Sequence, residues 1–262
     1  SITGSILGNI LLVLGAAILA GGVRHRRQTF NRTAAGLGTT MMALATIGLL
    51  VPSIYFRLAG HTPQAQATIE PLSEEIAVIL AATYLLSLVF SLGTHRHLFI
   101  TEESEPPEWS RAFAVLVLAA ATVGVAAMSE MLVGSVESAA HALGMSDVFV
   151  GVVVIAIIGN AAEHSTAVMA AWKNKMDLAV TIAVGSSLQV AMLVAPVLVF
   201  AGLAMGQPMD LHFSPMEAIA VVIALAAMAL VAHDGESHWM EGVMLLAVYA
   251  ILGLAFYHMP TG

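Results

Sequence analysis

Long apolar segments alternate with short polar stretches along the whole chain. Eight of these segments are long enough to cross roughly 30 Å of hydrocarbon at about 1.5 Å per helical residue. They lie at residues 1–21, 34–58, 72–93, 110–136, 146–171, 177–203, 214–232 and 239–258. Their length and uniform apolarity favour helices over the strands of a membrane barrel. The pattern predicts an all-α, polytopic membrane helical bundle.

The composition agrees with a membrane protein and excludes several other classes. Hydrophobic residues make up 59% of the 262 residues and charged residues only 10%, whereas soluble domains carry about 25% charged residues. The chain has no cysteine, which excludes disulfides, thiolate metal sites and cysteine nucleophiles. The net charge of −8 comes without a basic patch, so no nucleic-acid partner is expected.

Basic residues gather in three of the polar stretches. If every segment spans once, the loops after the first, third and fifth segments lie on one side, and only Arg57 lies on the other. By the positive-inside rule this side is cytoplasmic, which puts the C-terminus outside. The eight basic residues on this side are Arg24, Arg26, Arg27, Arg32, Arg96, Arg111, Lys173 and Lys175.

The first and sixth segments share a polar motif. TGSILGN at residues 3–9 and VGSSLQV at residues 184–190 both contain Gly-Ser followed by an amide residue. Because one segment enters from outside and the other from inside, the motifs predict inverted-topology repeats, a signature of secondary transporters. The fourth and fifth segments then need counterparts upstream of Ser1, so we expect about two N-terminal helices to be missing. We expect residues 1–100 to be the remainder of the N-terminal repeat, 101–109 a cytoplasmic acidic loop and 110–262 the C-terminal repeat.

Polar residues inside the fifth and sixth segments carry the clearest chemistry. Asn160 and Glu163 share one helix face, as do Ser186 and Gln189, because residues three apart are neighbours on a helix. Two antiparallel helices joined by a short turn bring these faces together at mid-membrane. Carboxylate, amide and hydroxyl oxygens are the ligands that Ca²⁺ prefers. The repeat adds two residues of the first segment, Ser5 and Asn9.

Structural roles compete with this interpretation. Ser, Asn and Gln commonly join membrane helices by hydrogen bonds. A carboxylate such as Glu163 is energetically costly at this depth, and this cost favours a functional role over a structural one. Burial favours the neutral form of a carboxylate. Glu163 would therefore carry a proton when no cation is bound, so that cation and proton compete for one group.

These motifs resemble a known family. GNAAEH at 159–164, K-x-K-x-D-L at 173–178 and GSSLQV at 185–190 resemble the second signature repeat of the Ca²⁺/H⁺ exchangers, the CAX family of the Ca²⁺/cation antiporter superfamily. SITGSILGNILLVLG at 1–15 resembles the second half of the first repeat, and THRHLF at 94–99 and SEMLVGSVE at 129–137 resemble other CAX segments.

The resemblance implies two five-helix inverted repeats, an extra N-terminal helix and alternating access to a mid-membrane site. It implies that Glu163 is one of two exchange carboxylates. It also implies that the site region includes Asn160, Ser186, Gln189, Ser5 and Asn9. The first-repeat Gly-Asn-x-x-Glu that would supply the second carboxylate is absent from residues 1–262.

Other polar residues allow both a functional and a structural interpretation. Glu130 belongs to a cation pathway or is paired in a helix interface, and for Glu137 a place near the outer surface is favoured. His164 points about 100° away from Glu163 around a helix; it is a possible proton relay, although a packing role is more common. The acidic residues at 102–108 are interpreted as a solvated loop.

The leading functional hypothesis is a secondary active antiporter that exports Ca²⁺ from the cytoplasm in exchange for H⁺. Its ligands are the transported Ca²⁺ and H⁺, with no cofactor, and its surroundings are the lipid bilayer of a prokaryotic plasma membrane or an organelle; the oligomeric state is open. One alternative is a Na⁺-coupled or monovalent cation exchanger, and another is a passive channel. A third, an intramembrane metal hydrolase, would bind zinc at His233, Asp234 and His238.

Overall fold

The computed structural model describes residues 2–60, 62–99, 109–142, 145 and 149–259. The side chains of residues 63–66, 130, 133–134 and 136–142 lie outside this description. Within the described ranges, seven continuous helical stretches are long and apolar enough to span a membrane, and a bent pair makes an eighth. The eight predicted segments and the all-helical membrane class are confirmed.

The first four spans are built from the following elements. The first span consists of α1 (Ile2–Leu7), the π-helical turn η1 (Gly8–Val13) and α2 (Leu14–Arg24). The strand β1 (Gln28–Thr29) leads to α3 (Arg32–Ala59). The third span is α4 (Pro63–Val89) with the π-helical turn η2 (Phe90–Thr94), followed by the short 3₁₀ helix η3 (Arg96–Leu98), and the fourth span lies in α5 (Arg111–Ala142).

The last four spans, one of them bent, are built from the following elements. The fifth is the bent pair, with η4 (Val150–Val154) and α7 (Ile155–Gly159) before the bend and α8 (Ala161–Trp172) after it. The sixth consists of α9 (Met176–Gln189), the π-helical turn η5 (Val190–Val194) and α10 (Ala195–Ala204). The seventh and eighth spans are α11 (Pro215–Ala232) and α12 (Trp239–Tyr257), with the strand β2 (Glu236–Ser237) between them.

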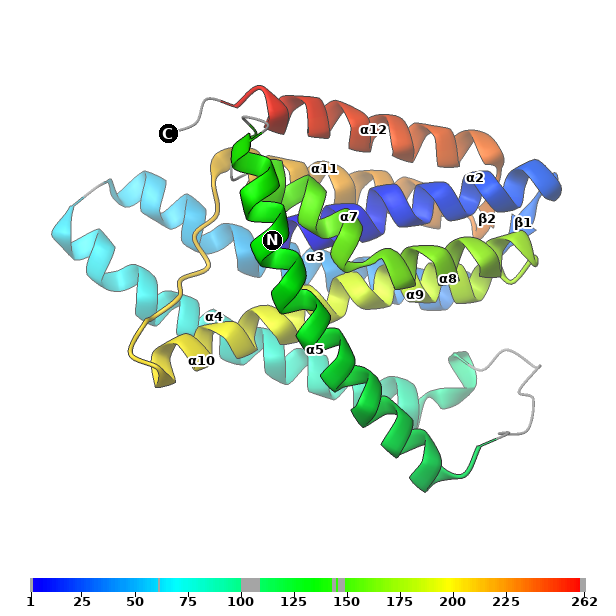
Figure 1. Cartoon of the computed structure of the whole chain (residues 1–262), viewed down its shortest axis with the longest axis horizontal. Coiled ribbons are helices and arrows are strands. Elements are labelled where there is room, and N and C mark those ends of the chain that lie inside the picture. The colour runs from blue at the N-terminus through cyan, green and yellow to red at the C-terminus, as the bar shows by residue number, and fades with distance from the viewer. Residues whose placement is uncertain (1, 61, 100–108, 143–144, 146–148, 260–262) are drawn as a thin grey trace.

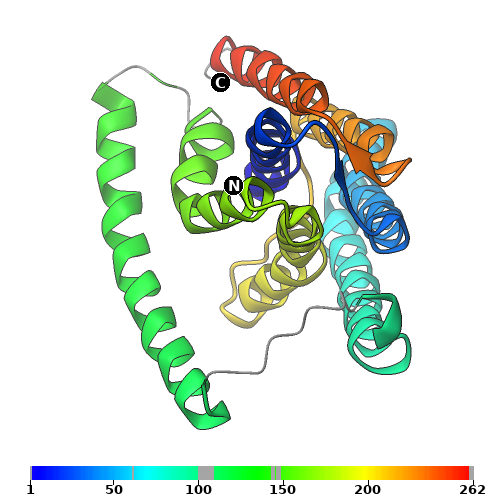
Figure 2. The ribbon, with the colours of Figure 1, turned by 90° about the vertical axis from the view of Figure 1, so that its right-hand side faces the viewer.

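The first span forms the centre of the bundle. Of its most apolar window 72% is buried, compared with 0% for the window in α5. Ile6, Ile10, Leu11 and Ile18 are fully buried, and α8, α9, α11 and α12 pack around them (Figure 1). Figure 2 shows α5 as a long helix at one side of the molecule, apart from the packed spans.

Loops that are distant in the sequence meet at one end of the bundle. Gln28 donates to the carbonyl oxygen of Ala171 over 2.8 Å, and the side chain of Asn31 donates to the carbonyl oxygen of Leu98 over 2.7 Å. The backbone N–H of Asn31 also donates to Asp177. The loops after the first, third and fifth spans therefore share one side, as the distribution of basic residues predicts.

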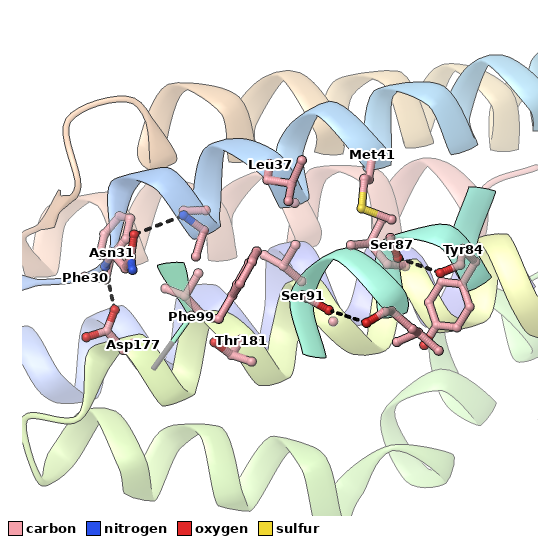
Figure 3. Close-up of a pocket in the computed structure, with 18 residues that line it drawn as sticks. Phe30, Asn31, Leu37, Met41, Tyr84, Ser87, Ser91, Phe99, Asp177 and Thr181 are labelled. Atoms are coloured by element: carbon pink, nitrogen blue, oxygen red, sulfur yellow. Dashed lines mark hydrogen bonds between the residues drawn. The ribbon is translucent and has the colours of Figure 1, made fainter. Parts of the chain in front are cut away.

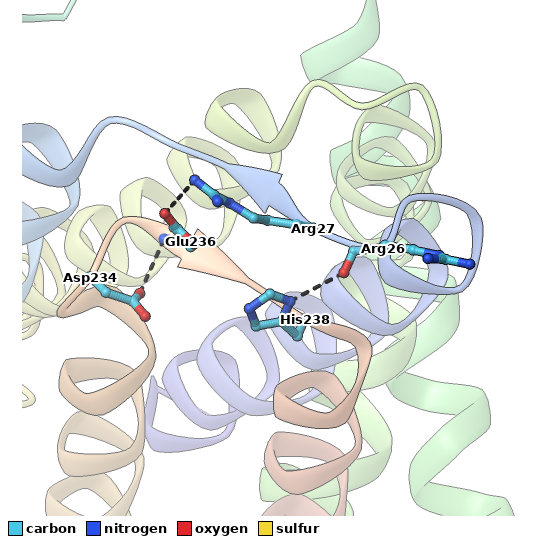
Figure 4. A network of polar contacts seen from close by, with 5 residues as sticks. All are labelled: Arg26, Arg27, Asp234, Glu236 and His238. Atoms are coloured by element: carbon cyan, nitrogen blue, oxygen red, sulfur yellow. Dashed lines mark hydrogen bonds and ion pairs between the residues drawn. The ribbon is translucent and has the colours of Figure 1, made fainter.

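A small two-stranded sheet also lies at this end. β1 pairs antiparallel with β2, with Gln28 opposite Ser237 and Thr29 opposite Glu236. Arg27 and Glu236 form an ion pair of 2.6 Å beside the strands (Figure 4). The loop between the seventh and eighth spans is thus joined by strand pairing to the loop after the first span. The sequence pattern could not show this, because each strand has only two residues.

Two π-helical turns occupy matching places in the first and sixth spans. η1 begins within the motif at residues 3–9, and η5 begins at the last residue of the motif at 184–190. A π-helical turn widens the backbone by one residue and is frequent at functional sites. The shared position of this irregularity supports the repeat relationship that the Gly-Ser-amide motifs predict.

Candidate cation site

A break in the fifth span places backbone ends beside the candidate carboxylate. Asn160 leaves the helical conformation, with φ −105° and ψ 15°, and the axes of the helical stretches on either side differ by 61°. The last carbonyls of α7 and the first N–H groups of α8 therefore meet within the span. Such half-helix ends bind ions in discontinuous membrane helices, with carbonyl oxygens suited to cations.

Glu163 lies in the first turn of α8, three residues after this break. Its side chain is half-buried, and no hydrogen bond or ion pair to it is found among the described residues. Asn160 is also half-buried, and its side-chain Nδ2 has no hydrogen-bond partner in the described part of the chain. A carboxylate, and an amide nitrogen, without partners among the described residues are thus placed at the break, within a membrane span.

The first span runs parallel to the fifth and brings η1 beside the break. A side-chain carbon added at Gly4 would lie 2.6 Å from the carbonyl oxygen of Val152, and one at Gly8 would lie 3.7 Å from the Cβ of Ala156. Further along, one at Gly21 would lie 2.9 Å from the carbonyl oxygen of Ala171. The two spans therefore keep a nearly constant register from one end to the other.

Asn9, in η1, is a buried polar residue beside the break. It is only 1% exposed, and neither its Oδ1 nor its Nδ2 has a hydrogen-bond partner in the described residues. Buried polar groups without partners are rare and need an explanation such as a bound ion or water. η1 packs against both α8 and α9. Asn9 is therefore available to a ligand between these elements.

The predicted site residues on the sixth span differ in their burial. α9 packs against α8, to which a short turn joins it, with Asn174 at a positive φ of 60°. Ser186 is half-buried and Gln189 is exposed, whereas the adjacent Ser187 is fully buried. The Ser187 hydroxyl donates to the carbonyl oxygen of Ala183 in its own helix over 2.9 Å, a structural role. Ser5 in α1 is half-buried.

Three other residues extend this description. His164 is half-buried and its Nε2 has no partner among the described residues. The hydroxyl of Tyr249 is likewise buried without a described partner, on α12, which packs against η1. No sequence pattern singles out Tyr249, because one tyrosine in an apolar segment is typical of packing. Glu130 and Glu137 belong to α5, but their side chains lie outside the described residues, as do residues 101–108 of the acidic loop.

One polar contact near the opposite end was missed by sequence reasoning. The Thr3 hydroxyl donates to a carboxylate oxygen of Glu217 over 2.7 Å, and Thr3 is 2% exposed. Ser214 and Glu217 form a capping box at the start of α11. The Ser-x-x-Glu spacing at 214–217 was the available signal, since this pattern marks helix starts. The contact joins the first span to the seventh.

The hypothetical zinc group between the seventh and eighth spans has a structural role. Asp234 accepts from the backbone N–H of Glu236 over 3.1 Å, and Nδ1 of His238 lies 3.2 Å from the carbonyl oxygen of Arg26 (Figure 4). Across the described ranges, no group of three or more His, Asp or Glu side chains could hold a metal ion. The metal hydrolase alternative therefore lacks a site there.

Membrane-spanning helices, one of them broken beside a carboxylate, define the class of secondary transporters with discontinuous helices. The chain belongs to the family described as sodium/calcium exchanger protein, whose model matches residues 1–93 and 113–257. It is thus a transporter and not an enzyme, and the family resemblance noted in its motifs is confirmed.

Relatives with assigned functions match the chain along its whole length. It is 44% identical to the Ca²⁺/H⁺ antiporter of Synechocystis sp., covering 100% of this chain and 75% of the relative. It is 42% identical to the Ca²⁺/H⁺ antiporter ChaA of Bacillus subtilis, covering 98% of this chain and 74% of the relative.

Solved structures agree with the fold. Native YfkE superposes with a TM-score of 0.82 at 39% identity, covering 98% of this chain and 74% of YfkE. The H⁺/Ca²⁺ exchanger CAX superposes with a TM-score of 0.68 at 14% identity, covering 97% of this chain and 68% of that protein, a likeness that concerns the fold alone.

Proposed function

We propose that this protein exchanges Ca²⁺ for H⁺ and exports Ca²⁺ from the cytoplasm. Relatives that are 44% and 42% identical are Ca²⁺/H⁺ antiporters, which supports both ions as substrates. The single observation that carries a local mechanism is a pair of polar groups beside the break with no side-chain partner in the described part of the chain, Glu163 on α8 and the buried Asn9 on η1. Both belong to elements that pack against each other.

In this proposal Ca²⁺ binds to oxygen ligands around the break in the fifth span. Glu163 supplies the charged oxygen, and the α7 carbonyls supply neutral ones. Oxygen ligands of this kind suit Ca²⁺, which accepts six to eight of them in flexible geometry. The neutral side chains proposed to contribute are Asn160, Asn9, Ser186, Gln189 and Ser5. Of these, Gln189 is exposed and Asn9 is buried.

Protons compete with Ca²⁺ at the same carboxylate. When Ca²⁺ leaves, Glu163 is an isolated charge within a membrane span, and taking up a proton removes the cost of that charge. A site that holds either Ca²⁺ or H⁺, and opens to one side at a time, couples the two fluxes in opposite directions. His164, with Nε2 unpartnered in the described residues, is a candidate to pass protons to or from Glu163.

The test uses the protein expressed from its native gene and reconstituted in proteoliposomes. Glu163→Gln keeps the size of the side chain but removes its charge and its proton uptake, so Ca²⁺-driven proton flux should stop. Glu70→Gln is the matched control, because Glu70 is an exposed carboxylate on α4. Retention of Ca²⁺/H⁺ exchange by the Glu163→Gln protein would refute the proposed role of this residue.

The coupling ion is tested separately. With the pH held equal on both sides of the membrane, an imposed Na⁺ gradient should not drive Ca²⁺ uptake. In a separate arm without Na⁺, an imposed proton gradient should drive it. Ca²⁺ transport driven by Na⁺ at constant pH would favour the Na⁺-coupled alternative.

A further inference from the structure

A cavity of about 290 Å³ lies between α3, α4 and α9, on the side of α9 that Gly185 lines. Its volume is at the low end of known ligand pockets, which start near roughly 300 Å³. The proposed exchange mechanism does not use it. Most of its wall is apolar and comes from membrane-spanning segments, including Leu37, Met41, Val180 and Leu188.

The charged residue of this cavity lies at one of its ends. Figure 3 shows Phe30, Asn31 and Asp177 together at that end, with Tyr84 and Ser87 at the other. One carboxylate oxygen of Asp177 accepts from the backbone N–H of Asn31. No ion pair to Asp177 occurs among the described residues. A carboxylate beside an aromatic ring is a pairing that binds ammonium groups.

The cavity spans the depth of one lipid leaflet. Asp177 lies in the first turn of α9, next to the turn with the basic residues Lys173 and Lys175, and Leu188 lies near the end of this helix. The distance along the helix from Asp177 to Leu188 is about 16 Å at about 1.5 Å per residue. This is close to half of the roughly 30 Å hydrocarbon thickness. The cavity thus runs from the headgroup level toward the bilayer midplane.

We propose that this cavity binds a phospholipid whose headgroup is a primary amine. The ammonium binds Asp177 and the face of Phe30, and the acyl chain lies along the apolar wall toward Gly185. The carboxylate of Asp177, which lines the cavity, thus complements the positive charge of the ammonium. A primary ammonium has three N–H donors, whereas a quaternary choline has none.

The position of the cavity connects the lipid to α9. Gly185 lines the cavity, and the next residue, Ser186, is one of the proposed Ca²⁺ ligands. At the same level α3 packs closely on α9, since a side-chain carbon added at Gly38 would lie 2.7 Å from Cγ1 of Val184. An acyl chain in the cavity therefore supports α9 from the side opposite to α8.

The test measures lipid retention and does not depend on transport. The protein is reconstituted in nanodiscs with equal amounts of phosphatidylethanolamine and phosphatidylcholine of the same acyl chains, then transferred to mild detergent for native mass spectrometry. Retained lipid should favour phosphatidylethanolamine by about tenfold, as a charge-assisted hydrogen bond at a half-buried site supports. Equal retention of both lipids by the wild-type protein would overturn the proposal.

Two variants and one control locate the bound lipid. Asp177→Asn keeps an oxygen that can accept from Asn31 but removes the charge, so the preference for phosphatidylethanolamine should disappear. Asp234→Asn, a carboxylate at the same end of the bundle outside the cavity, should keep it. Ser87→Met leaves the carboxylate intact and fills the far end of the cavity, so it should lower the amount of retained lipid. A full preference in Asp177→Asn, or unchanged retention in Ser87→Met, would contradict this location.

Discussion

The side-chain amide of Gln28 donates a hydrogen bond to the carbonyl oxygen of Ala171 over 2.8 Å. Gln28 is 1% exposed and also donates to the side-chain oxygen of Asn174 over 3.1 Å. Ala171 is near the end of α8, and Asn174 is in the turn before α9. One buried side chain thus fastens the loop after the first span to the two helices that carry Glu163 and Ser186.

Replacing Gln28 should destabilise this end of the bundle. Gln28→Ala removes two hydrogen bonds, to the Ala171 carbonyl and to the side chain of Asn174, which contribute about 0.5–1.5 kcal/mol each. Gly21→Ala should act in the same direction, because an added Cβ would lie 1.9 Å from the side-chain oxygen of Gln28. The unfolding midpoint of the purified protein in detergent measures both effects. Gly36→Ala is the control, since nothing lies within 4 Å of a Cβ at that position, and a midpoint unchanged in Gln28→Ala would disprove the fastening role.

The crossing of α2 and α12 should tolerate no side chain at Gly242. A Cβ there would lie 2.4 Å from the backbone nitrogen of Leu19 and 2.6 Å from the carbonyl oxygen of Gly15. Gly242→Ala should therefore separate the helices and cost about 1–3 kcal/mol, the usual range for overpacking. Gly253→Ala on the same helix meets nothing within 4 Å and should leave the thermal unfolding midpoint unchanged. Equal midpoints for the two variants would contradict the close crossing.

Asn9 and Ser187 should separate a ligand role from a structural one. Asn9→Ala removes two buried polar atoms that have no described partner, so stability should hold or increase while the apparent Ca²⁺ affinity falls by about tenfold, equivalent to ~1.4 kcal/mol. Ser187→Ala removes a hydrogen bond within α9 and should change Ca²⁺ affinity little. Ca²⁺-concentration dependence of exchange in proteoliposomes, with unfolding midpoints alongside, measures both. A loss of affinity in Ser187→Ala and none in Asn9→Ala would reverse the assignment.

The ion pair between Arg27 and Glu236 should contribute little. The two side chains are 58% and 33% exposed, and exposed pairs contribute about 0–1 kcal/mol because water and salt screen them. A double-mutant cycle with Arg27→Gln and Glu236→Gln should give a coupling energy in that range, smaller at high salt. A coupling well above it would mean that strand pairing between β1 and β2 depends on this pair.

Much of the fold and part of the candidate site could be predicted from the sequence. The eight spans follow from apolar length alone, since only a continuous apolar segment of sufficient length can cross the hydrocarbon of a bilayer as a helix. The shared side of the basic loops follows from counting charges. The GNAAEH motif singled out Asn160 and Glu163, because a carboxylate within a span is costly enough to be informative by itself.

The sequence alone therefore determined the number of spans, their sidedness relative to one another, and the residues with the most informative chemistry. Three features follow from the packing of the spans and not from local sequence: the 61° break at Asn160, the burial of Asn9 without a described partner, and the different burial of Ser186 and Ser187. The tertiary structure also decided the pairing of β1 with β2 and the cavity beside Asp177. Apolar length and charge are local properties that act through the bilayer, whereas burial and partners depend on how distant segments pack against one another.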